Sequence, residues 1–231
     1  FHGALHRSEP QPPASAGAGA KRSGPPSRCA TPGDCASARG LAAIDAAAVA
    51  FGMPMGPLEL IDEVGLDIAA HAGASLVAAY GARMRTSTLL AGLVERKELG
   101  KKSGRGIFTW SADKSGRARR GATNPALARP SSNVDASLSR AELTDRMILA
   151  MVAEAARCLD ERVVASEREL DLASVFGTGF APFHGGIWSY ARARGLAAIA
   201  ERLRALAQSP GVAQRDGGPE RFAPAPALAG G

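Results

Sequence analysis

The chain has 231 residues, 45% of them hydrophobic and 22% charged, with a formal net charge of +6. This length and composition fit one large globular domain or two small ones. No run of about 18 apolar residues occurs, and no hydrophobic segment follows the polar N-terminal residues, so the sequence predicts neither a membrane span nor a secretory signal. The three cysteines form no paired framework, which predicts a reducing, cytoplasmic setting and no metal site. The chain begins with Phe1, and we interpret it as a piece of a longer gene product.

The positive charge lies outside the apolar parts of the chain. Residues 1–40 carry five basic and two acidic side chains, and residues 111–140 carry six and two. Residues 41–110 carry seven of each sign, and residues 141–207 carry eight basic and nine acidic side chains. A nucleic-acid-binding domain usually presents a basic face with interleaved aromatic rings on its folded part. The distribution therefore predicts no nucleic-acid partner.

Composition divides the chain into five segments. Residues 1–40 hold six of the fifteen prolines and almost no large apolar side chains, which predicts a disordered tail. Residues 41–110 and 141–207 have helical apolar patterns and are expected to form two small folded units. Residues 111–140 are polar with two X-Pro breakers and are expected to be a linker, and the Pro/Gly/Ala-rich residues 208–231 a second disordered tail.

The first patterned region predicts three helices. One opens at Gly56-Pro57, because proline is well tolerated at the first helical position. Its expected apolar face carries Leu58, Ile61 and Val64, and its expected polar face carries Glu59, Asp62 and Glu63. A second helix runs from about Asp67 to Gly81, and a third from Thr88 to Leu99.

The second patterned region opens with a long amphipathic helix, expected over Arg140–Glu161. A shorter helix follows from Ser166 to about Val175, where Ser166 and Glu169 have the spacing of a capping box. Another begins after Gly185-Gly186, and the last runs from Leu196 to about Ala207. Gly106–Trp110 is the one extended candidate. The pattern predicts an all-α protein.

The two patterned regions resemble each other. In the first region, Ile44-Asp45 is followed by Gly52, Pro54 and Gly56. In the second region, Leu170-Asp171 is followed by Gly179, Pro182 and Gly185. The offsets are 126 residues between the aspartates, 127 between Gly52 and Gly179, and 128 between Pro54 and Pro182. This agreement favours an internal duplication, although Gly-x-Pro turns that simply recur between helices are the alternative. We expect structural turns at Pro54, Gly56, Pro57, Pro182 and Gly185, and packing of the two units through Pro57–Tyr80 and Gly185–Leu206.

The segment AIDAAAVAFGMPMGPLELIDEVGLDIAAH, with the later loop LGKKSGRGIF, resembles the C-terminal domain of 3-hydroxyacyl-CoA dehydrogenases. The segment MVAEAARCLDERVVASERELDLASVFGTGFAPFHGGIWSYARARG resembles a second copy of that domain. Two tandem copies are the pattern of the multifunctional fatty-acid β-oxidation α-subunit. The resemblance implies an oxidoreductase that oxidises a 3-hydroxyacyl-CoA with NAD, in which this chain contacts a Rossmann domain or other subunits of a β-oxidation complex.

The sequence offers no catalytic or cofactor-binding residue for that reaction. A Rossmann site needs a strand, a Gly-x-Gly-x-x-Gly turn and a helix, and the string Gly100–Gly106 follows a helix without that spacing. His2 and His6 lie in the tail, and His71 and His184 have no evident acidic partner. Lys101, Lys102 and Arg105 are weak candidates for contacts with CoA phosphates; a helix stop with solvated cations is the alternative. NAD is thus expected in the full-length enzyme and no cofactor in this chain.

One departure from the family precedes Ile44-Asp45. The family places a long helix there that starts with a Gly-Phe-x-x-Asn-Arg-like string, and this chain has residues 1–40 instead. We hypothesise a frameshifted or misjoined gene end, with a genuine disordered extension as the alternative. Two functions remain open: an enzyme part that is inactive without its NAD-binding half, and a non-catalytic structural or interaction module derived from that enzyme. Acyl chain length and stereochemistry do not follow from the sequence.

Overall fold

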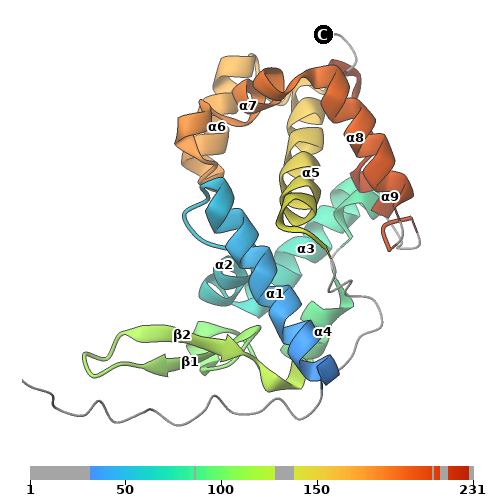
Figure 1. The fold of residues 1–231 in the computed structure, drawn as a ribbon. Helices are drawn as coiled ribbons and strands as arrows, with labels where there is room; N and C mark the ends of the chain where they lie inside the picture. The colour runs from blue at the N-terminus through green and yellow to red at the C-terminus, as the bar shows by residue number, and fades with distance from the viewer. Residues whose placement is uncertain (1–31, 86, 128–137, 210, 214–217, 229–231) are drawn as a thin grey trace, which may run out of the picture.

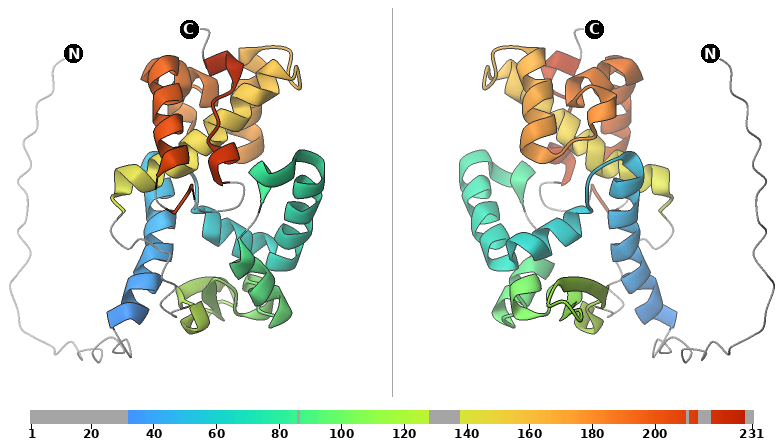
Figure 2. Two further views of the ribbon diagram at one scale, coloured as in Figure 1. Left: turned by 90° about the vertical axis from the view of Figure 1, so that its right-hand side faces the viewer. Right: turned by 90° about the vertical axis from the view of Figure 1, so that its left-hand side faces the viewer.

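The computed structural model describes residues 32–85, 87–127, 138–209, 211–213 and 218–228. Helices dominate, and one small antiparallel hairpin is added to them (Figure 1). The prediction of a mainly helical protein is therefore confirmed. Figure 2 shows two groups of elements, the first unit up to β2 and, above it, the second unit from α5 onward.

The first unit contains four helices and the hairpin. The helices are α1 (Pro32–Phe51), α2 (Pro57–Val64), α3 (Leu66–Tyr80) and α4 (Thr88–Glu95), with a 3-10 turn, η1 (Gly81–Met84), after α3. Strands β1 (Phe108–Ala112) and β2 (Ala118–Thr123) pair with Trp110 opposite Arg120 and a register irregularity between Phe108 and Trp110. Short 3-10 turns at Lys101–Ser103 (η2) and Pro125–Leu127 (η3) flank the hairpin.

The second unit contains four main helices and a packed C-terminal segment. They are α5 (Arg140–Asp160), α6 (Glu167–Thr178), α7 (Ile187–Arg194) and α8 (Leu196–Gln208), followed by α9 (Gly218–Arg221); 3-10 turns lie at Pro182–His184 (η4) and Pro226–Leu228 (η5). The Ser166 half of the predicted capping box is present, since Ser166 Oγ accepts from Glu169 N at 3.2 Å. The Glu169 side chain reaches one residue further back, and its Oε2 accepts from Ala165 N at 3.0 Å. The local sequence thus starts α6 where the capping pattern predicts it.

Two apolar cores differ in size. The second unit buries a large cluster from α5, α6, α7, α8 and the C-terminal segment, including Leu149, Trp188 and Leu203. The core cluster of the first unit is smaller and consists of Leu66, Leu93, Ile107 and Phe108, with partly buried residues around them. Because buried apolar area supplies most of the driving force for folding, the second unit gains more stabilisation from its core than the first unit does.

The predicted segment boundaries need three corrections. Helix α1 begins at Pro32, inside the predicted tail of residues 1–40, whose residues 1–31 lie outside the described part. The predicted linker 111–140 instead contributes β2 and η3, and its Asn124 is buried, donating to Gly106 O at 2.7 Å. The predicted tail 208–231 packs Phe222 and Leu228 into the second core. In the second and third cases, long-range contacts order a segment whose own composition does not predict structure.

The two units meet at different surfaces from those predicted. Helix α1 packs against α5, and α9 packs against η1, rather than residues 57–80 against residues 185–206. Arg83 of η1 pairs with Glu154 of α5 at 3.2 Å, and Arg221 of α9 donates to Arg83 O at 3.2 Å. These contacts make the C-terminal segment part of the junction between the units.

We expect Phe222→Ala to lower the free energy of unfolding by about 3 kcal/mol, because it opens a cavity in the second core. Phe176→Ala is the matched control, since the Phe176 side chain is 85% exposed. Urea unfolding of both variants measures the difference. A Phe222→Ala midpoint equal to that of Phe176→Ala would contradict the packing of the C-terminal segment.

A second prediction concerns Asp145 on α5, which accepts from Arg194 and Arg202, each at 2.8 Å. Burial pushes the pKa of Asp145 upward, but the hydrogen bonds from Arg194 and Arg202 outweigh it and hold the pKa below its ordinary value. The ion pairs therefore stabilise the fold fully above the unfolded-state pKa of about 4, and their contribution is lost as the pH falls through the lower folded-state value.

We expect Asp145→Asn to cost about 1–2 kcal/mol at pH 7, with the difference from the wild type shrinking between pH 4 and pH 2. Urea unfolding of both proteins across that range is the measurement. A difference that grows on acidification would show that Asp145 does not carry this linkage.

Candidate functional site

A buried carboxylate on α1 holds the start of α2. Asp45 is 2% exposed, and its oxygens accept from Leu58 N at 2.9 Å and Glu59 N at 3.1 Å. These are first-turn N–H groups that have no partner within the helix, and the N-cap Gly56 offers no side-chain cap. The negative carboxylate also complements the positive end of the helix dipole.

Arg120 of β2 joins this contact from the hairpin. Its Nη1 lies 3.0 Å from Asp45 Oδ2 and 2.8 Å from Glu59 Oε2, and its guanidinium lies over the Phe108 ring. Burial raises the pKa of Asp45 above its ordinary value, while the N–H groups of Leu58 and Glu59 and the Arg120 charge act in the opposite direction. The hairpin is thereby tied to α1 and α2.

The second unit repeats the arrangement. Asp171 Oδ1 accepts from Trp188 N at 2.7 Å and Ser189 N at 3.1 Å at the start of α7, and Ser189 Oγ donates to Asp171 Oδ2 at 2.6 Å. In both units the N-cap glycine makes room for the carboxylate: a Cβ on Gly56 would lie 2.0 Å from Asp45 Cγ, and one on Gly186 would lie 2.4 Å from Asp171 Oδ1. We call each arrangement a carboxylate clasp.

The predicted turn residues fall around these clasps. Pro57 is the first residue of α2, and Pro182 is the first residue of η4. Pro54 lies against Gly179, so the turns of the two units touch each other. Gly185 ends η4 at a φ of 79°, but the counterpart of Gly56 is Gly186, one residue later than the sequence comparison suggested.

Asp62 forms a second buried contact, and here the sequence-based prediction was wrong. Asp62 was expected on the polar outer face of α2, but it is fully buried and accepts from Ile107 N and Phe108 N at 2.8 Å and from Trp110 Nε1 at 2.9 Å. A Cβ on Gly106 would lie 2.3 Å from Asp62 Oδ1. Gly106 therefore makes room for this carboxylate, and Gly100 makes room for the backbone of Asp62. The indole N–H of Trp110, which needs an acceptor when buried, is the sequence signal that could have indicated this contact.

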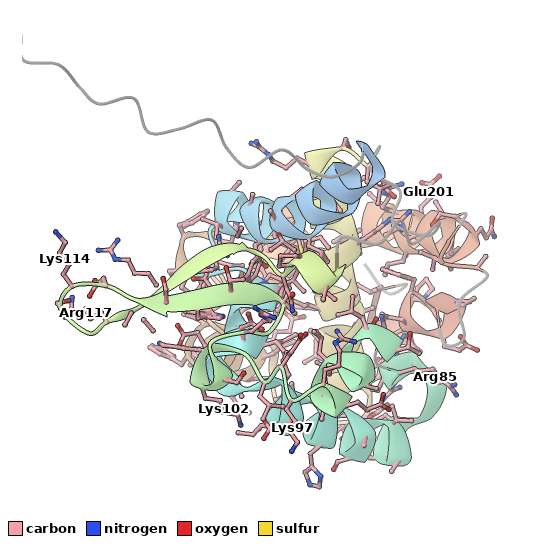
Figure 3. All side chains as sticks on the ribbon, turned by 90° about the horizontal axis from the view of Figure 1, so that it is seen from below. Arg85, Lys97, Lys102, Lys114, Arg117 and Glu201 are labelled. Atoms are coloured by element: carbon pink, nitrogen blue, oxygen red, sulfur yellow. The ribbon has the colours of Figure 1, made fainter. Side chains whose placement is uncertain are left out.

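The candidate CoA contacts are engaged within the chain. Lys101 Nζ pairs with Glu63 at 2.7 Å and lies over the Trp110 ring, and Lys102 Nζ pairs with Asp67 at 2.6 Å. The hydrogen bond from Lys102 lowers the pKa of Asp67. The Arg105 side chain is exposed and makes no ion pair within the described residues, while its backbone bridges to Gly100 and Thr109. Figure 3 shows Lys102 below the hairpin, whose tip carries Lys114 and Arg117. Of the three candidates, Arg105 has the free charge.

Neither described histidine has a carboxylate partner. His184 stacks on Phe51 with ring centroids 4.7 Å apart and lies 5.1 Å from the Tyr190 ring, at the junction of the two turns. His71 lies exposed on α3. Within the described ranges, no three His, Cys, Asp or Glu side chains converge as a metal site would require, and no helix has the length and apolar character to cross a membrane.

Comparison with known families identifies the first unit. Residues 37–110 match the family model described as 3-hydroxyacyl-CoA dehydrogenase, C-terminal domain. Residues 37–110 form a 3-hydroxyacyl-CoA dehydrogenase C-terminal domain. The resemblance in the Asp45–Gly56 segment and the Gly100–Gly106 loop is thus confirmed, and the family's N-terminal Rossmann part is not covered by the match.

Solved structures share the fold beyond the matched residues. 3-Hydroxybutyryl-CoA dehydrogenase from Escherichia coli K12 is 20% identical with a TM-score of 0.60, over 84% of this chain and 54% of that one. The dehydrogenase part of multifunctional enzyme 1 from C. elegans is 22% identical with a TM-score of 0.56, over 80% of this chain and 40% of that one. This chain therefore spans about half the length of these dehydrogenases or less, and at these identities the likeness concerns the fold.

The clasp predicts the effect of Gly56→Val. Gly56 has a φ of −73°, which any residue adopts, so the cost arises from the contact with Asp45. We expect a loss of about 3 kcal/mol from overpacking. Gly177→Val is the matched control, because a Cβ on Gly177 in α6 meets no atom within 4 Å. Urea midpoints measure both changes, and an unaltered midpoint for Gly56→Val would contradict the clasp.

Proposed function

We propose that this chain is the helical, substrate-facing and assembly part of an enzyme that oxidises 3-hydroxyacyl-CoA with NAD in fatty-acid β-oxidation. The observation that carries the proposal is the family match of residues 37–110, which covers the first clasp and the loop held by Asp62. We further propose that the chain is inactive by itself and works when joined to an NAD-binding half.

We propose that the 100–106 loop does not bind NAD. A dinucleotide cradle needs glycines that leave open space beside a helix N-terminus. Here a Cβ on Gly100 would lie 2.3 Å from Asp62 O, and one on Gly106 would meet Asp62 Oδ1. The space beside these glycines is filled by α2, so we assign the pyrophosphate to another part of the enzyme.

We propose that the second unit is a second copy of the same domain. Gly65, at a φ of 108°, separates α2 from α3, and Gly195, at a φ of 93°, separates α7 from α8. The two interhelical glycines are therefore 130 residues apart in the sequence. Each pair begins at a clasp. Chance recurrence of Gly-x-Pro turns would not reproduce the carboxylate, the N-cap glycine and the interhelical glycine together.

The contribution of this chain to substrate binding is positioning. We propose that Arg105 contacts a CoA phosphate, and that Lys101 and Lys102 do so only by exchanging their pairs with Glu63 and Asp67. A positioning wall accelerates the reaction only when the reacting groups lie on the opposing side of the cleft. A positioning role would therefore give activity only when the NAD-binding half is present.

The second candidate function is a non-catalytic interaction module. The specific observation in its favour is that two of the three candidate phosphate contacts are neutralised by the chain's own carboxylates. A module of this kind would bind a partner subunit but would not restore oxidation when joined to an NAD-binding half.

We expect the isolated chain to show no saturable NADH binding by calorimetry and no oxidation of 3-hydroxybutyryl-CoA by NADH absorbance. The same chain joined covalently to the NAD-binding half of a 3-hydroxyacyl-CoA dehydrogenase should oxidise that substrate. In that joined enzyme, Arg105→Ala should raise KM several-fold while Arg117→Ala, at the hairpin tip, leaves it unchanged. Saturable micromolar NADH binding by the isolated chain would overturn the proposal, and an inactive joined enzyme would favour the interaction module.

A further inference from the structure

A cavity of about 750 Å³ lies in the second unit, where the end of α5 meets the starts of α6 and α8. One face of α7 and Ala227 of the C-terminal segment complete its walls, and its apolar lining includes Leu159 and Leu196. The volume is within the range of small-molecule sites in proteins. The polar groups in its walls therefore indicate what kind of molecule it accepts.

Trp188 lines this cavity and has a polar group without a partner. Trp188 and Arg192 lie one turn apart on the face of α7 that borders the cavity. Trp188 is 3% exposed, and its indole Nε1 has no hydrogen-bond acceptor among the described residues. Trp110 shows the ordinary arrangement, since its Nε1 donates to Asp62 at 2.9 Å. A buried donor left without an acceptor costs free energy and requires an explanation.

The carboxylate clasp does not explain the indole of Trp188. Leu58 holds the corresponding position in the first unit, because each is the second residue of its helix and donates its backbone N–H to the clasp carboxylate. The first clasp thus forms with a side chain that has no polar edge. The N–H of Trp188 is a feature of the second unit alone, and it is available to a ligand.

The start of α8 adds further donors to the cavity. This helix has 13 residues, its N-cap Gly195 receives no side-chain cap, and Leu196 and Ala197 of its first turn line the cavity. The N–H groups of a first turn have no acceptor within the helix, and they form the positive end of the helix dipole. Together with Trp188 Nε1, these groups favour a carboxylate.

Asp160 gives the cavity an opposite charge. It is the last residue of α5, at the negative end of that helix dipole, and it forms no ion pair with any residue that the structure describes. Its Oδ2 accepts from Ala227 N at 3.2 Å. Glu167 and Arg192 pair with each other at 2.7 Å, so Asp160 leaves the lining with one net negative charge. A ligand that carries a cation as well as a carboxylate balances this charge.

We propose that the cavity binds a small zwitterion. Its carboxylate accepts hydrogen bonds from Trp188 Nε1 and from the start of α8, its ammonium group pairs with Asp160, and its short apolar body contacts Leu159 and Leu196. This inference is independent of whether the chain serves NAD-dependent oxidation.

The indole N–H signals of the ¹⁵N-labelled chain test the proposal, because Trp110 and Trp188 give one signal each and Trp188→Phe assigns them. The probes are 4-aminobutyrate, 6-aminohexanoate and 8-aminooctanoate. We expect at least one of them to shift the Trp188 signal saturably and to leave the Trp110 signal in place. The fatty acid and the alkylamine of the same length should each bind at least tenfold more weakly, because each lacks one of the two charges.

Asp160→Asn should weaken binding of the tightest amino acid at least tenfold, because it removes the partner of the ammonium group. Glu201→Gln is the matched control, since Glu201 is exposed on α8 and forms no ion pair within the described ranges. It should bind the amino acid like the wild type, and equal urea midpoints should show that both variants fold. Absence of a saturable Trp188 shift with all three amino acids, equal affinity for the fatty acid, or unchanged affinity in Asp160→Asn would each overturn the proposal.

Discussion

A carboxylate set against the first turn of a short helix is the interaction on which both units depend. Helices α2 and α7 have eight residues each, a length at which an isolated helix is marginal in water. Asp45 and Asp171 accept the N–H groups that such a helix leaves unpaired at its start. Each clasp works only because its N-cap residue is a glycine, so the carboxylate and the glycine form one structural element.

The two units stabilise the same clasp by different means. The first unit surrounds Asp45 with Arg120 from the hairpin, and it anchors the loop before the hairpin on buried Asp62. The second unit relies on a larger apolar core, to which the C-terminal segment adds Phe222 and Leu228. Polar contacts of this kind contribute less net free energy than apolar burial and depend more on geometry. The stability of the first unit therefore depends more than that of the second on the geometry of contacts between its segments.

The contacts of the 100–106 loop bear on the proposed role of the chain. The glycines that give the 100–106 loop its resemblance to a nucleotide-binding string make room for Asp62, and the loop's two lysines are held by Glu63 and Asp67. The loop is thus fixed by contacts within the chain. Under the proposed function, the one free guanidinium of this loop, Arg105, would position an anionic substrate against groups supplied from elsewhere.

The sequence by itself determined the helical class, the positions of the helices from α2 to α8, though not of α1, and the family match of residues 37–110. Helix α5 was expected over Arg140–Glu161 and ends at Asp160, and the Ser166–Glu169 box starts α6, because caps and apolar periodicity act within a few residues. The same local patterns indicated the repeat through Asp45 and Asp171.

Only the tertiary structure decided what these local elements touch. It buried Asp62, paired Arg120 with Asp45, and packed the Pro- and Ala-rich C-terminal segment into the second core. It also left Leu76 of α3 exposed and buried Leu206 of α8. Such outcomes depend on partners many residues away in the chain, and a residue's own neighbours in sequence carry no information about whether that partner is present.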